Sequence, residues 1–194
     1  MKKTIVTIAF AISALFVNAQ TFNGVEVGGQ LNTAYQQFLA KGYKLYKAYD
    51  HAYSLTGSFL GTNIELFIYG TPKTNKFFKA VVYLPKHDNY YDLRNQYDSY
   101  LELLVGKYGK PENQYDNFLS PYYAGDGYEM QAVEMDKTNI SSFWLNLSGA
   151  NYYIEISKFK QVKIVYENDA NGRINNREVE LLKQNIFWTT RPNP

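Results

Sequence analysis

Apolar residues recur at helical spacing in three stretches of the chain. The first covers residues 31–39, and Gly42 beyond it suits the left-handed end of a helix. The second covers residues 93–108 and is followed directly by Gly109. The third covers residues 171–187 and is rich in charged side chains. We expect this last helix to pack through Val179, Leu182 and Ile186.

Between these stretches the apolar residues alternate with polar ones, which is typical of half-buried strands. The first series is predicted at residues 53–59, 64–68 and 78–84. The second is predicted at residues 128–135, 143–147, 152–159 and 162–167.

The order of elements is therefore a helix and then strands, twice, with one further helix at the end. This order predicts an α+β fold, in which an antiparallel sheet packs against helices. Similar helix ends, Lys41-Gly42-Tyr43 and Lys107-Tyr108-Gly109-Lys110, suggest a duplication with half-repeats at residues 20–87 and 88–194.

The N-terminus has the pattern of a cleavable signal peptide. Lys2 and Lys3 precede an apolar run at residues 5–17, and Ala19 supplies a small residue for cleavage. The run is too short for a membrane-spanning helix, which needs about 20 residues. We expect residues 1–19 to be removed and residues 20–194 to form one globular domain in the periplasm or outside the cell, with no membrane attachment after cleavage.

Composition narrows the possible partners. The chain has no cysteine, which excludes disulfides, thiol nucleophiles and thiolate metal sites. Without Lys2 and Lys3, 20 − 2 = 18 basic residues balance 18 acidic ones. A nucleic-acid partner is not expected, because binding to phosphates needs an excess of positive charge.

Aromatic residues are unusually frequent, with 19 Tyr and 12 Phe. Strand faces favour tyrosine, so a sheet alone accounts for much of this enrichment. A surface for a protein or glycan partner is the alternative, because tyrosine is common in binding sites. Tyr122 and Tyr123, within the irregular stretch at residues 111–127, are the candidate partner-binding residues.

Catalytic and metal-binding patterns are weak. The chain has two histidines, His51 and His87, and lacks a Gly-x-Ser-x-Gly nucleophile motif. We therefore assign no catalytic, cofactor-binding or metal-ligating residue. Two carboxylates of a glycan-directed hydrolase could still meet in the fold, although Glu65, Glu102, Glu134 and Glu155 occupy positions typical of a solvated face.

Residues 167–178 approach the spacing of a calcium-binding EF-hand loop, with Gly172 at the sixth position and Glu178 at the twelfth. Glu167 departs from the usual Asp at the first position, and a strand enters the segment instead of a helix. The same residue types cap helices, so we favour Asp169 or Asn171 as the cap of the last helix.

Several segments resemble a family of small exported Bacteroidetes proteins whose function is not established. They are Phe22-Asn23-Gly24-Val25, the helix end at residues 38–43, the stretch from Tyr100 to Pro111, and Val162-Lys163-Ile164-Val165-Tyr166 leading to Asp169; the junction Asn18-Ala19-Gln20 is similar to the leaders of that family. The resemblance implies export and fold, and it implies no chemistry.

The sequence thus favours an exported, non-enzymatic binding or accessory domain that contacts a protein or glycan through exposed tyrosines. A hydrolase with paired carboxylates and a calcium-stabilised structural module are the alternatives.

Overall fold

The structure is a computed structural model that describes residues 20–189. The predicted leader, residues 1–19, lies outside the described residues. No helix in the described part of the chain is both long and apolar enough to cross a membrane.

Apart from a short pair of strands before the first helix and a short helix in the second half, the elements follow the predicted order of helices and strands. The first half contains β1 (Thr21–Phe22), β2 (Val25–Glu26), α1 (Leu31–Ala40), β3 (Lys44–Tyr49), β4 (Ala52–Phe59), β5 (Thr62–Gly70) and β6 (Phe77–Tyr83). The second half contains α2 (Tyr90–Tyr108), β7 (Asn113–Phe118), α3 (Glu129–Glu134), β8 (Thr138–Leu147), β9 (Ala150–Ser157), β10 (Gln161–Asn168) and α4 (Asp169–Thr189).

Eight strands form one sheet in the order β3-β4-β5-β6-β10-β9-β8-β7, and every neighbouring pair is antiparallel. The predicted α+β class, with an antiparallel sheet and a C-terminal helix, is confirmed. Each half contributes four strands to this sheet, and the halves meet where β6 pairs with β10. The arrangement agrees with a duplication, which stays a prediction.

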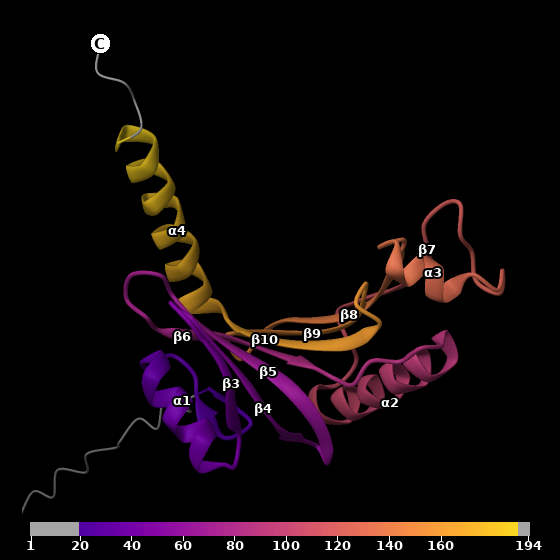
Figure 1. The fold of residues 1–194 in the computed structure, drawn as a ribbon, viewed down its shortest axis with the longest axis horizontal. Coiled ribbons are helices and arrows are strands. Elements are labelled where there is room, and N and C mark those ends of the chain that lie inside the picture. Colours follow the sequence, from indigo (N-terminus) through magenta and orange to yellow (C-terminus); the bar gives the residue numbers. More distant parts are fainter. Residues whose placement is uncertain (1–19, 190–194) are drawn as a thin grey trace, which may run out of the picture.

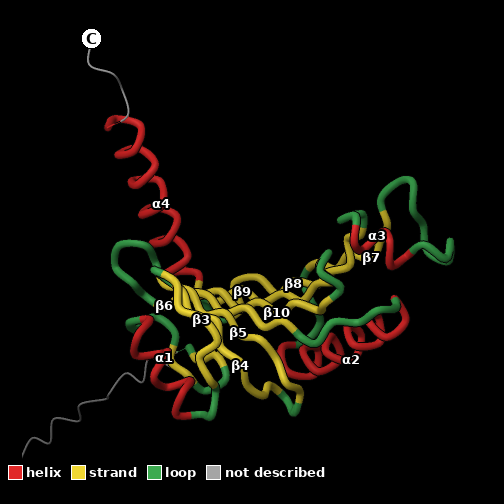
Figure 2. Tube along the Cα trace, viewed as in Figure 1, coloured by secondary structure: helices red, strands yellow, loops and turns green. Residues whose placement is uncertain are grey.

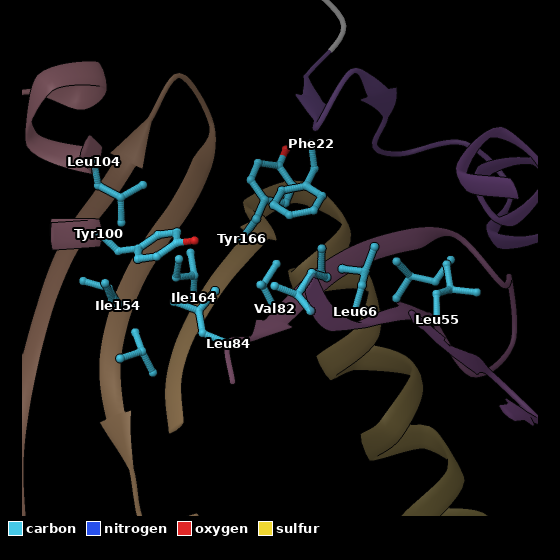
Figure 3. Close-up of a cluster of buried hydrophobic side chains, with 14 of the residues drawn as sticks. Phe22, Leu55, Leu66, Val82, Leu84, Tyr100, Leu104, Ile154, Ile164 and Tyr166 are labelled. Carbon is cyan, nitrogen blue, oxygen red and sulfur yellow. The ribbon is translucent and has the colours of Figure 1, made fainter. Parts of the chain in front are cut away.

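The core lies between one face of the sheet and helices α1 and α2 (Figure 1). Alternate residues of the central strands point to this side, as in the pairs Leu66 with Val82 and Ile164 with Ile154. Figure 3 shows these side chains together with Tyr100 and Leu104 of α2. The two helices end as predicted, because Gly42 and Gly109 both have a positive φ, of 89° and 81°.

Polar hydrogen bonds fix α2 against the same face. The Tyr97 hydroxyl lies 2.9 Å from the Ser142 hydroxyl, and the Tyr100 hydroxyl donates to the Thr62 hydroxyl at 2.7 Å. Trp144 donates its indole N–H to the carbonyl of Gly109 at 2.8 Å. Each of these three buried aromatic side chains therefore has a partner for its polar atom.

The predicted strands differ from the structure in three places. Residues 128–135 contain the helix α3, because Glu129, Met130 and Gln131 are strong helix formers and a short apolar run does not define its period. The stretch at residues 111–127 is not all irregular, since it contains β7. The strand β3 was not predicted, because it lies at the sheet edge with all six residues exposed and shows no alternation of burial.

The last helix is longer than predicted and packs differently. Val179 is half-buried near the sheet, but Leu182 is 37% exposed and does not support the helix as expected. The side chain of Ile186 lies outside the described residues. Figure 1 shows that α4 projects away from the body, so its later turns leave the sheet.

Candidate binding surface

The sheet has a second face, opposite α1 and α2, which we call the open face (Figure 2). The side chains on it alternate with those of the core along every central strand. Its aromatic residues include six from five strands, which are Phe67, Tyr69, Tyr83, Tyr115, Phe143 and Tyr153. These residues are half-buried or exposed, so their rings remain accessible to a ligand.

The aromatic side chains form two clusters. In the first, Phe67 lies 5.7 Å from Tyr83 and 6.2 Å from Tyr69 between ring centroids. In the second, Phe143 lies 5.4 Å from Tyr153 and 6.1 Å from Tyr115. Such distances are typical of stabilising aromatic pairs, so the rings are held in place before any ligand arrives.

The charged side chains of the open face occur in opposite pairs. Lys79 contacts Glu167 at 3.1 Å, and Lys163 is paired with Glu155. Burial, and then the nearby Glu155 and Glu167 carboxylates, raise the pKa of Tyr153 well above its usual range. The Tyr153 hydroxyl therefore keeps its proton at neutral pH and can donate a hydrogen bond.

Three hollows adjoin Tyr83 on this face. The largest, of about 780 Å³, lies between β3, β4, β5 and β6 and is lined by Tyr46, Thr56 and Glu65 among others. A second, of about 250 Å³, lies over β8, β9 and β10 and includes Glu155. A third, of about 350 Å³, is bounded by both aromatic clusters. The wall of the largest of these hollows thus contains two tyrosines, Tyr46 and Tyr83, and one acidic residue, Glu65.

Two segments rise on the same side of the sheet as the open face. They are α4 at one end and the stretch containing α3 at the other (Figure 1). Asn175 and Val179 of α4 line a further hollow of about 640 Å³ together with Tyr69 and Phe78. The open face is therefore bordered by α4 near the ends of β5 and β6.

The predicted partner-binding residues Tyr122 and Tyr123 lie in the loop between β7 and α3. Tyr123 is 66% exposed and Tyr122 is half-buried. The carboxylate of Asp126 fixes the loop by accepting hydrogen bonds from the backbone N–H of Tyr123, at 3.0 Å, and of Tyr128, at 2.7 Å.

The same loop encloses a small hollow of about 360 Å³. Pro121, Tyr122, Tyr123 and Tyr128 provide most of its wall. This hollow shares no lining residue with the three that adjoin Tyr83. The predicted residues Tyr122 and Tyr123 therefore line a hollow of their own, and the larger aromatic surface lies elsewhere. Their role in partner binding stays a prediction.

The acidic residues considered for a hydrolase have separate partners. Glu65 accepts a hydrogen bond from Ser54 at 2.8 Å, and Glu134 contacts Lys160 at 3.2 Å. Asp136 lines the same hollow as Glu155, but it lies 3.8 Å from Lys158. The hydrolase hypothesis stays a prediction, because no observation on the described residues favours it.

The segment 167–178 does not form a calcium loop. Glu167 lies in β10 and the residues after Asn168 are helical, so the twelve residues do not curl around a common point. The predicted helix cap is present, but the capping residue is Asn168, whose side-chain oxygen accepts from the N–H of Asn171 at 2.9 Å. Within residues 20–189 there is no group of three His, Asp or Glu side chains that could hold a metal ion.

Sequence reasoning did not identify the open face as a site. The alternation of aromatic residues in 64–68, 78–84 and 152–159 was visible, and it indicated which residues share one side of each strand. The order of the strands was not visible, because β6 pairs with β10, which is far away in the sequence.

Comparisons of the chain with protein-family models, with curated proteins and with solved structures found no match. The resemblance to exported Bacteroidetes proteins therefore stays a prediction. The fold and the surface of the protein are the basis on which its function can be inferred.

Proposed function

We propose that this chain is an exported, non-enzymatic binding module that holds a ligand outside the cytoplasm against the open face of its sheet. The observation that carries the proposal is the pair of aromatic clusters on a sheet face opposite the two core helices. Tyrosine is among the residue types that contribute most often to binding energy.

The state of the charged groups supports binding rather than catalysis. Lys79 and Lys163 are already neutralised by Glu167 and Glu155. A ligand that covers these pairs does not leave an unpaired charge in a dry environment, which would be costly. The pairs therefore favour a surface that becomes covered, while catalysis usually needs a group free to exchange protons or to attack.

The extent of the surface also supports this function. The residues of the two aromatic clusters come from β5, β6, β9, β8 and β7. In the sheet, β5 and β7 are the first and the last of six neighbouring strands, because β10 lies between β6 and β9. Five strand spacings of ~4.8 Å give a width of ~24 Å. This width suits an extended or macromolecular ligand better than a single small molecule.

In the experiment, the unchanged protein and its variants are immobilised, and a cell-envelope extract of the producing organism is passed over each. The amount of material that each protein retains is compared. The double replacement Phe143→Thr and Tyr153→Thr removes two of the three rings of the second aromatic cluster while keeping residues that favour strands. We expect at least a tenfold loss of the retained material, because two of the aromatic rings that form the surface are lost together. Replacement of Tyr122 and Tyr123 by Ala tests whether the loop contributes.

Tyr91→Ala is the matched control. Tyr91 is 74% exposed but lies on α2, which covers the other face of the sheet. The Tyr91→Ala variant should retain as much material as the unchanged protein. Circular dichroism should show that all variants are folded. Equal retention by the double variant, or no specific retention by the unchanged protein, would contradict the proposal.

A further inference from the structure

Polar side chains form a continuous row across the strands of the open face. Successive cross-strand pairs connect Thr56, Glu65, Tyr83, Lys163, Glu155 and Ser141. We call these residues the polar row. It crosses six neighbouring strands, which corresponds to a length of ~24 Å at ~4.8 Å for each spacing.

The polar row connects two of the hollows of the open face. The hollow of about 780 Å³ contains Thr56, Glu65 and Tyr83, and that of about 250 Å³ contains Tyr83, Lys163, Glu155 and Ser141. Tyr83 lies in the wall of both. The depressions therefore follow a line perpendicular to the strands, with Tyr83 near its middle.

Hydroxyl and amide groups make up much of the polar lining of this line. The larger hollow includes Ser58, Asn63 and Gln161 in addition to Thr56. The smaller includes Thr138, Asn139 and Ser157 in addition to Ser141. Such groups both donate and accept hydrogen bonds, so they match a ligand that carries many hydroxyl groups.

Aromatic rings border both hollows. Tyr46 borders the larger hollow and is 71% exposed, Tyr83 borders both, and the exposed Phe159, in the turn between β9 and β10, borders the smaller one. Aromatic rings offer flat apolar surfaces, and the C–H face of a pyranose ring is the complementary apolar surface of a sugar.

Other ligand classes fit this line less well. An anionic ligand would need several free cations, but Lys163 is paired with Glu155, and Lys158 lies 3.8 Å from Asp136. Among the lysines that line the two hollows, this leaves Lys44 as the one without an ion pair in the described part of the chain. A peptide strand would bind along a sheet edge, because backbone pairing needs unpaired groups. The polar row lies across the interior of the sheet, where each strand is hydrogen-bonded on both sides.

We infer that the open face binds a neutral, linear oligosaccharide along the polar row, across the strands. Tyr46, Tyr83 and Phe159 stack on sugar rings, and the hydroxyl and amide groups between them hydrogen-bond to sugar hydroxyls. This inference rests on the proposed function and names the class of its ligand.

The test is calorimetric titration of the purified protein with cellohexaose, maltohexaose and chitohexaose. At least one of these hexasaccharides should bind, and the monosaccharide of the same sugar should bind at least tenfold more weakly, because it occupies one ring position only. Tyr46→Ala and Tyr83→Ala should each weaken hexasaccharide binding about tenfold or more, which corresponds to about 1.4 kcal/mol.

Tyr46 is mostly exposed, so its replacement leaves the fold intact and keeps the test valid if Tyr83→Ala unfolds. Tyr91→Ala again serves as the control and should bind as the unchanged protein does. Binding that is insensitive to both Tyr46 and Tyr83 overturns the inference.

The two proposals fail in different ways. If none of the hexasaccharides binds while the Phe143 and Tyr153 double variant still loses retained material, the open face binds a ligand of another class and the oligosaccharide inference is wrong. If the double variant also retains its material, the proposed function is wrong as well.

Discussion

The carboxylate of Glu178 shows how one side chain fixes an element that otherwise projects from the body. It accepts hydrogen bonds from the backbone N–H groups of Lys73 and Thr74, at 2.6 and 3.2 Å, and from the Thr74 hydroxyl at 2.7 Å. The side chain is 6% exposed. Because Glu178 lies on α4 and its partners lie between β5 and β6, these bonds hold the helix to the sheet.

The pKa of Glu178 reflects this arrangement. Burial by itself raises the pKa, but the hydrogen bonds from Thr74, Lys73 and Thr71 outweigh it, and the pKa lies below its usual range. A carboxyl group whose pKa is lower in the folded protein stabilises it above its unfolded pKa, about 4.3. This contribution is lost as the pH falls through the folded-state pKa.

We predict that Glu178→Gln lowers the free energy of unfolding by about 1–3 kcal/mol at pH 7, because the charged acceptor is lost. The difference between the two proteins should shrink at acidic pH, because the carboxyl group of the unchanged protein takes up a proton as the pH falls through its lowered folded-state pKa. Urea unfolding at pH 7 and at a series of acidic pH values measures both quantities.

Glu180→Gln is the control for this replacement. Glu180 is two residues away on the same helix and is exposed. In the described part of the chain its carboxylate forms one ion pair, with Lys183 at 3.0 Å. It should change the unfolding free energy by less than about 1 kcal/mol. A similar loss from both variants would contradict a specific role for Glu178.

At the scale of an element, the close contact between Tyr43 and β4 explains a glycine in the middle of a strand. A side chain at Gly57 would place its Cβ 2.4 Å from Cδ1 of the Tyr43 ring. The ring cannot easily move, since the Tyr43 hydroxyl donates to the carbonyl of Ser58 at 3.0 Å and accepts from Asn23 at 2.9 Å. Glycine in a strand often marks such an approach.

We predict that Gly57→Ala lowers the free energy of unfolding by about 1–3 kcal/mol, because the added methyl group overpacks this contact. Denaturant unfolding measures the loss, and near-ultraviolet circular dichroism should show a changed environment for tyrosine.

Gly106→Ala provides the opposite case in the same protein. Gly106 lies in the last turns of α2, and a Cβ there would meet nothing within 4 Å. Alanine favours helix, so this variant should be more stable by about 0.5–1 kcal/mol. An equal loss at both positions would show that the tight contact with Tyr43 is not the cause.

At the scale of the whole molecule, the central pair β6 and β10 joins the halves. Five residue pairs, from Lys163 with Tyr83 to Glu167 with Lys79, form this junction. The buried side chains on either side of it belong to one hydrophobic core. A continuous sheet with a continuous core favours cooperative unfolding.

We therefore predict a single unfolding transition in urea. Far-ultraviolet circular dichroism follows both halves, and tryptophan fluorescence follows the second half, where Trp144 packs 6.3 Å from Tyr108 between ring centroids. The two signals should give the same midpoint. Separate midpoints would show that the halves unfold independently.

The sequence predicted the elements that build the core better than those at the edges and surface of the protein. The helices α1 and α2 were predicted together with the glycines at their ends. In both, the helical spacing of the apolar residues ends where a glycine favours the end of a helix, so the two signals agree. The strands β4, β5, β6, β9 and β10 were predicted from alternation. The edge strands β3 and β7 and the helix α3 were not, because their exposed or short sequences lack a periodic signal.

The α+β class, most of the core and the residue types available for binding follow from the chain alone. These properties depend on local periodicity and composition, which are present in the chain before it folds. The aromatic residues of β5, β6, β9 and β8 share one surface only because the chain folds into this sheet. Their neighbourhood arises from pairing between strands far apart in the sequence, and no local pattern encodes such pairing.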